Sequence, residues 1–104
     1  MNNRVLSFNS LVDYKQHQIR SRSLNKSFGI ELPMMIYALD KGESISEELT
    51  SLTKLIQVTD GVLEILLDGQ SHQLAAGEMI VISPMTMHGL QAHRPCKFVQ
   101  METV

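Results

Sequence analysis

Three glycine-containing turns divide the second half of the chain into short apolar runs, and their spacing is the strongest constraint on the fold. The turns are Asp60-Gly61, Asp68-Gly69 and Ala76-Gly77. An Asp-Gly pair between two apolar runs is a strong signal for a β-hairpin. The predicted strands cover 62–67, 71–74, 78–83, 87–92 and 97–104. Short strands at this regular spacing predict an all-β sandwich or barrel.

The segment 44–58 fits a helix and a pair of strands almost equally well. Its leucines and isoleucines recur at helical spacing, and its first residues resemble a capping box. Many of its residues are β-branched, however, and these favour an extended chain. The second interpretation has strands at 43–50 and 54–59 with a tight turn at 51–53. In either case Lys54 lies within an apolar run, where an unpaired charge is costly.

The length and composition describe an ordinary single domain. With 104 residues, 43% of them hydrophobic and 19% charged, the chain is expected to form one domain, 1–104, with its own core. No apolar run reaches the roughly 20 residues of a membrane span, and the first ten residues lack the apolar core of a signal peptide. Cys96 is the only cysteine and is expected to be inert. These features predict a cytoplasmic protein that does not bind membranes.

The charges are unevenly distributed along the chain. Residues 1–30 carry five basic side chains against one acidic side chain, whereas the remainder carries 4 basic and 10 acidic ones. A basic segment of this kind can contact nucleic acid. Its charges are scattered and have few aromatic residues among them, so we expect a solvated face and no nucleic-acid partner.

The N-terminal segment, 1–35, has a weaker pattern than the rest. Residues 8–14 could begin a helical turn at Asn9 or Ser10. Residues 29–39 form an apolar run interrupted at Pro33, which suits an edge strand or a bend. An apolar edge strand can pair with a second chain to cover its exposed backbone. The segment is therefore expected to supply edge or dimerisation strands of a homodimer.

The sequence GESISEELTSLTKLIQVTDG resembles the first motif of the cupin family, which consists of small antiparallel β-barrels. That motif runs glycine, five residues, His-any-His, three or four residues, glutamate, six residues, glycine. Both glycines fit without a gap, at Gly42 and Gly61, and the positions between them fall on Glu48, Thr50 and Lys54. The resemblance implies a jelly-roll barrel, also called a double-stranded β-helix. It therefore favours the two strands over the helix.

The sequence GEMIVISPMTMHG is similar to the second cupin motif. Gly77 opens the strand, and His88 occupies the histidine position. The Pro-x-Gly turn of the motif is altered, because Pro84 lies one residue late and Met85 replaces the glycine. The resemblance covers 36–104, which is expected to be the barrel core.

In cupins the two histidines and the glutamate of the first motif converge with the second-motif histidine on one metal ion. Only His88 keeps the family's residue type here. Glu48 is still an oxygen donor, Thr50 offers only a neutral hydroxyl, and a protonated Lys54 has no acceptor. An ammonium about 4 Å from a divalent cation would repel it by about 8 kcal/mol at an effective dielectric near 20. The resemblance therefore implies a barrel without a functional metal and without a cofactor.

The same four positions are expected to form a ligand site inside the barrel. Lys54 and His88 would donate to an anionic or carbonyl ligand, while Glu48 and Thr50 would orient it between aliphatic walls. The leading hypothesis is a small cupin that binds a small polar or anionic molecule without a tightly bound metal. The alternative is a purely structural role, in which Glu48 forms an ion pair that compensates the charge of the buried Lys54.

Two further hypotheses remain open at this point. One is an enzyme, either metal-dependent through Glu48 and His88, as in a dioxygenase, or a metal-free isomerase or lyase. In the metal-free case His88 would be the general base and Lys54 would stabilise an oxyanion. The other is a structural dimer whose cavity is filled by its own side chains. The sequence does not decide whether a reaction is catalysed.

The remaining metal candidates are weaker. Met85, Met87 and His88 could suggest a copper(I) site. In an extended chain, however, Met87 and His88 face opposite sides. The other histidines are expected on the surface, at His17, His72 and His93.

Overall fold

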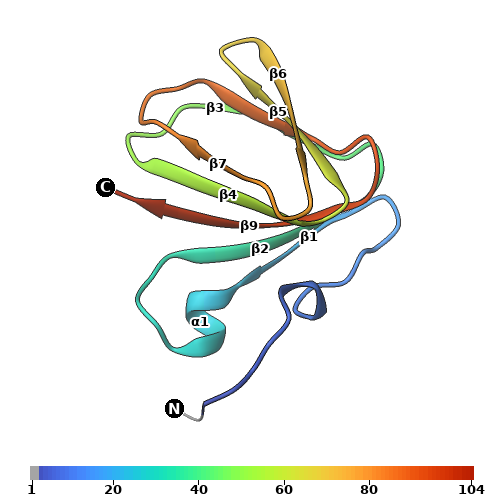
Figure 1. Ribbon diagram of the computed structural model, residues 1–104, viewed down its shortest axis with the longest axis vertical. Helices are drawn as coiled ribbons and strands as arrows, with labels where there is room; N and C mark the ends of the chain where they lie inside the picture. The colour runs from blue at the N-terminus through green and yellow to red at the C-terminus, as the bar shows by residue number, and fades with distance from the viewer. Residues whose placement is uncertain (1–2) are drawn as a thin grey trace.

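The computed structural model describes residues 3–104, which contain two antiparallel sheets that enclose the main core (Figure 1). The five-stranded sheet has the order β1 (Ile19–Ser23), β2 (Met34–Leu39), β9 (Cys96–Thr103), β4 (Thr53–Asp60) and β7 (Met79–Ile82). The four-stranded sheet has the order β3 (Ser44–Glu48), β8 (His88–Gln91), β5 (Val62–Leu67) and β6 (Gln70–Ala75). The predicted all-β architecture is therefore confirmed.

The ambiguous segment is a pair of strands, β3 and β4, and not a helix. Burial alternates along β4, so that Lys54, Ile56 and Val58 all point into the core. This period of two explains why a lysine lies within an apolar run, because Lys54 occupies an inward position of the strand. Burial of alternate side chains between the two sheets outweighs the local helical signals.

The hairpin between β5 and β6 has the predicted Asp-Gly turn. Leu67 pairs with Gln70, which leaves a loop of the two residues Asp68 and Gly69. Their φ angles are 47° and 82°, as a type I′ turn requires. The turn joins the two strands within the same sheet. The five strands predicted after residue 61 are all present, with shifts of at most one residue at their ends.

Of the two expectations for 29–39, the bend is confirmed by the bent backbone at 31–32, and the edge strand is wrong. The strand in this segment, β2, is paired on both sides, with β1 and with β9. Pro33 precedes β2 and does not interrupt it, so all of the strand's amides are free to pair. The edge of this sheet is formed instead by β1, together with β7 on the opposite side.

The N-terminal segment packs on the outer face of β2 and β9 and forms a second, smaller core (Figure 1). It contains the 3-10 turn η1 (Phe8–Ser10), which agrees with the helical turn expected there, and the helix α1 (Leu24–Phe28), which was not predicted. The Ser23 side chain caps α1, and Gly29 ends it with a φ of 67°. Within residues 3–104, no helix has the length and apolar character needed to cross a membrane.

Candidate functional site

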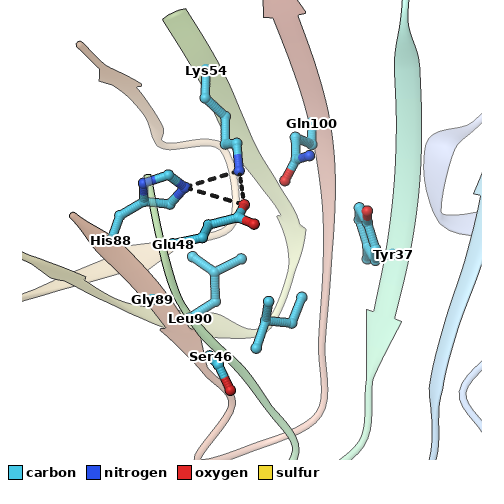
Figure 2. A pocket seen from close by; sticks show the side chains of 9 residues that line it. Tyr37, Ser46, Glu48, Lys54, His88, Gly89, Leu90 and Gln100 are labelled. Atoms are coloured by element: carbon cyan, nitrogen blue, oxygen red, sulfur yellow. Dashed lines mark hydrogen bonds and ion pairs between the residues drawn. The ribbon is translucent and has the colours of Figure 1, made fainter. Parts of the chain in front are cut away.

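Three of the four predicted site residues meet between the two sheets (Figure 2). Lys54 comes from β4 of one sheet, whereas Glu48 ends β3 and His88 begins β8 of the other. Lys54 Nζ lies 2.6 Å from Glu48 Oε1 and 2.9 Å from His88 Nε2. Glu48 Oε1 is 3.6 Å from His88 Nε2, so the three groups form a closed triangle.

The strand pairing fixes this arrangement. Glu48 and His88 lie directly opposite each other where β3 pairs with β8. Their side chains therefore start from neighbouring points and both reach toward Lys54 on the facing sheet. The side chains of Lys54 and His88 are only 3% and 2% exposed, while that of Glu48 is 53% exposed.

The neighbours of His88 determine its tautomer. Its Nδ1 lies 2.9 Å from the backbone oxygen of Thr86, which can only accept a hydrogen bond. Its Nε2 faces the ammonium of Lys54, which can only donate. The proton is therefore on Nδ1, and Nε2 accepts. The expected role of His88 as a donor to a ligand does not match this tautomer, and its lone pair is engaged and not free to act as a base.

The charges around Lys54 are two carboxylates against one ammonium. Besides Glu48, the Oε1 atom of Glu102 lies 3.8 Å from Lys54 Nζ. The hydrogen bond from Lys54 holds the pKa of Glu48 below its usual value, with the charge of the same ammonium adding to the effect. The carboxylate of Glu48 is thus ionised at neutral pH, and Lys54 is compensated within the protein.

Thr50 does not join the other three residues. It lies in the connection between β3 and β4, beyond the end of β3 at Glu48. Its Oγ1 accepts a hydrogen bond from the backbone amide of Leu52 at 3.1 Å, and its carbonyl accepts one from Met85 at 2.8 Å. Thr50 therefore shapes the turn and does not line the cavity, because local bonding to the backbone is the common role of threonine in turns.

The triangle borders a cavity of about 140 Å³ between the sheets. Its wall includes two polar residues that were not predicted as site residues, Tyr37 on β2 and Gln100 on β9 (Figure 2). Burial, with the carboxylates of Glu102 and Glu48, raises the pKa of Tyr37. Gln100 reaches the site because β9 pairs with β4, and Tyr37 reaches it because β2 pairs in turn with β9. Neither pairing was predicted. The cavity is open, so the protein's own side chains do not fill it.

The other candidates lie elsewhere. Met87 is partly exposed while the adjacent His88 is buried, and Met85 is 64% exposed, so the three do not converge. The remaining histidines are all on the surface, as predicted. Cys96 is buried, and this burial raises the pKa of its thiol to about 11. The thiol therefore stays protonated and inert at neutral pH.

The metal that a cupin resemblance implies does not fit these residues. A metal ion here would need the lone pairs of His88 Nε2 and Glu48 Oε1, but both atoms accept hydrogen bonds from Lys54 Nζ. The ammonium occupies the space between them and carries the charge that a metal would supply. Across residues 3–104, no group of three or more His, Cys, Asp or Glu side chains is arranged to hold a metal ion.

The comparisons with known proteins agree with this fold. The sequence model of the family described as the AraC-like ligand binding domain matches residues 36–101. No curated protein matches the chain in sequence. Among solved structures, a conserved protein of unknown function from Streptococcus pyogenes is 24% identical, with a TM-score of 0.88, and the match covers 99% of this chain and 89% of that one.

Two more solved structures extend the likeness. A cupin superfamily protein from Desulfitobacterium hafniense is 22% identical over 100% of this chain and 94% of its own, with a TM-score of 0.88. Salicylate 1,2-dioxygenase from Pseudaminobacter salicylatoxidans is 18% identical over 81% of this chain and 26% of its own, with a TM-score of 0.72. At these identities the likeness shows a shared fold, and the predicted cupin barrel is confirmed.

Proposed function

The chain belongs to the family of AraC-like ligand-binding domains within the cupins, and from this premise we propose that it binds a small polar or anionic molecule in its barrel without a tightly bound metal. The observation that carries the proposal is the buried ammonium of Lys54 at the edge of an open cavity. A buried charge is costly even when paired, and it is commonly kept where it serves recognition. Apolar walls with a few convergent polar groups are typical of ligand sites.

The volume limits the size of the ligand. A cavity of about 150 Å³ holds benzene, and the cavity beside Lys54 measures about 140 Å³. Pockets for drug-sized molecules are larger, about 300–1,000 Å³. The ligand therefore has about six to ten non-hydrogen atoms, unless part of it extends past the half-exposed Glu48 into solvent.

A thermal-shift panel of small carboxylates, amides and sugars tests the proposal. We expect at least one compound to raise the melting temperature of the wild type and to lose that effect in Lys54→Met. Lys97→Met is the matched control, because Lys97 is also buried, at 8% exposure, but bonds to the backbone of Asn9 away from the cavity. A panel with no shift, or a shift that Lys54→Met retains, would contradict the proposal.

The proposal includes a homodimer. Val81 on β7, Leu55 on β4 and Met101 on β9 form a row on the outer face of the larger sheet, since each is paired directly with the next. Val81 is 57% exposed, and its neighbour Met79 is 53% exposed. An uncharged apolar row of this kind favours contact with a second copy. Sedimentation velocity should give a dimer for the wild type and for Leu32→Glu, but a monomer for Val81→Glu.

The proposed location is the cytoplasm. Cys96 is a free, buried thiol, which suits a reducing compartment.

A further inference from the structure

Glu48 is the least anchored member of the triangle. Its side chain is 53% exposed, against 3% and 2% for those of Lys54 and His88. It ends β3, which is an edge strand of the smaller sheet, and the register of β3 shifts between Ile45 and Glu48. The Glu48 carboxylate can therefore rotate into solvent without disturbing the core, whereas the other two side chains cannot leave.

The charges restrict how an anion could enter the cavity. With Glu48 in place, Lys54 Nζ already donates to Glu48 and to His88, and the Glu102 carboxylate lies 3.8 Å away. An additional anion would meet two carboxylates and one committed ammonium, which is unfavourable in a partly buried site. An anion that takes the place of Glu48 would leave the local charge unchanged.

We infer that Glu48 is an internal counter-carboxylate that the carboxylate of the ligand replaces on Lys54, so that the site selects short monocarboxylates. This inference rests on the proposed function. The incoming carboxylate accepts the hydrogen bond from Lys54 Nζ that Glu48 gives up, and the freed Glu48 regains water. The apolar remainder of the ligand packs in the cavity against Ile45 and Leu90, with Tyr37 and Gln100 on the opposite wall.

The exchange has a consequence for affinity. In the wild type the ligand must compete with a carboxylate that is already bonded at 2.6 Å. Removing that competitor while leaving Lys54 in place should strengthen the binding of carboxylates. Because a charge-assisted hydrogen bond is at stake, we expect the gain to be about tenfold or more. Neutral ligands of the same shape gain little, since they do not replace the charge of Glu48.

Calorimetric titration with acetate, propionate, butyrate and benzoate, beside acetamide, propionamide, butyramide and benzamide, tests the inference at neutral pH and fixed ionic strength. The proteins are the wild type, Glu48→Gln and Glu102→Gln. Glu102→Gln is the matched control, because it removes the same charge near Lys54 but not the group bonded to it. We expect Glu48→Gln to bind the carboxylates about tenfold more tightly than the wild type does. In Glu102→Gln the affinity for the carboxylates should change by less than about threefold. Circular dichroism verifies that each variant is folded, and Glu48→Ser repeats the test with a smaller side chain.

The outcomes separate the inference from the proposed function. Carboxylate binding in Glu48→Gln that is equal to or weaker than in the wild type would overturn the exchange of carboxylates. Equal gains in affinity in Glu48→Gln and Glu102→Gln would do so too. In both cases the proposed ligand site would still stand. Binding of the amides without any carboxylate would also overturn the exchange. If none of these compounds binds the wild type or Glu48→Gln, the inference is wrong, and the proposed function is wrong as well if the thermal-shift panel gives no shift.

Discussion

The ammonium of Lys54 lies 2.9 Å from Nε2 of His88, on the lone pair that a metal-binding histidine would use for its metal. Thr86 holds the proton of the same imidazole on Nδ1 through a contact of 2.9 Å. His88 is therefore oriented as a ligand, with a backbone partner behind it in the manner of metal sites. The cation that it faces is supplied by the chain itself.

The ion pair predicts a loss of stability in acid. The folded pKa of Glu48 lies below its unfolded value near 4.5 because Lys54 donates to it. The unfolded chain thus binds more protons in that range, and the stabilisation present above pH 4.5 is lost as the pH falls through the depressed folded pKa. The contribution is small, because Glu48 is half exposed.

Urea unfolding at several pH values below 6 checks this prediction. The free energy of unfolding should fall less steeply with acid in Glu48→Gln than in the wild type. Lys54→Met should flatten the same region, because it removes the cause of the shift. The same acid dependence in all three proteins would be inconsistent with the ion pair.

The backbone conformation of Met85 predicts that its replacement by glycine stabilises the protein. It has a φ of 63°, and it occupies the position where the second cupin motif has glycine. This left-handed conformation costs a residue with a side chain about 1–2 kcal/mol, whereas the greater freedom of glycine in the unfolded chain costs about 0.4–1 kcal/mol. The side chain of Met85 is 64% exposed and contributes little packing. We expect Met85→Gly to raise the free energy of unfolding by about 0.5–1 kcal/mol.

Met87→Gly is the control for this effect. Met87 is 36% exposed and has no positive φ, so glycine there removes packing and adds flexibility. Denaturant melts should show it to be destabilised. Destabilisation of both variants by the same amount would mean that the backbone of Met85 is not strained.

The sequence specified the cupin frame because glycines at tight positions leave a strong local signal. Gly61 has a φ of 74° and lies where an added Cβ would clash with the Pro95 carbonyl oxygen. The alternating strand β4 likewise carries its own signal, since Lys54 follows the same inward period as its apolar neighbours. Glu48 and Lys54 were expected to lie opposite each other in one hairpin of the strands 43–50 and 54–59, and this expectation is wrong. The two strands belong to different sheets, and the contact between Glu48 and Lys54 crosses from one sheet to the other.

The errors concern relations between distant segments. Gln100 lies beside the triangle because β9 pairs with β4, and Tyr37 does so because β2 pairs with β9. No local pattern in these strands indicates which strand each pairs with. The position of β2 inside the sheet depends on its pairing with β1. β1 was not predicted, because its residues are mostly polar and alternate only weakly. Thr50 was misassigned because one bulged strand end decides whether its side chain faces the cavity or the turn.

The two motif glycines predict unequal costs for the same substitution. Gly42 and Gly61 both have positive φ, at 86° and 74°, but only Gly61 has atoms close to the position of an added Cβ. Gly42→Ala should therefore lose about 1 kcal/mol from backbone strain alone, and Gly61→Ala about 3 kcal/mol or more, because the clash with Pro95 is added. Equal losses in thermal or urea melts would show that the contact with Pro95 is not a constraint.

The replacement of Lys54 predicts a gain of metal binding. Lys54→Glu removes the ammonium and introduces a carboxylate between Glu48 and His88, which gives three ligands of the kind that divalent metals accept. Without metal, this variant should be less stable than the wild type, since Glu48 and Glu102 then lie near a third carboxylate. Lys54→Gln is the control, because it removes the ammonium without adding a charged ligand.

A calorimetric titration of the untagged wild type and Lys54→Glu with Mn²⁺, Ni²⁺ and Zn²⁺ under identical conditions tests whether Lys54 has replaced a metal ion. If the ammonium of Lys54 stands in the place of a metal ion, the wild type will bind none of them tightly and Lys54→Glu will bind about one ion per chain. A wild type that binds one equivalent as tightly as the variant would show that Lys54 does not exclude a metal ion from the site.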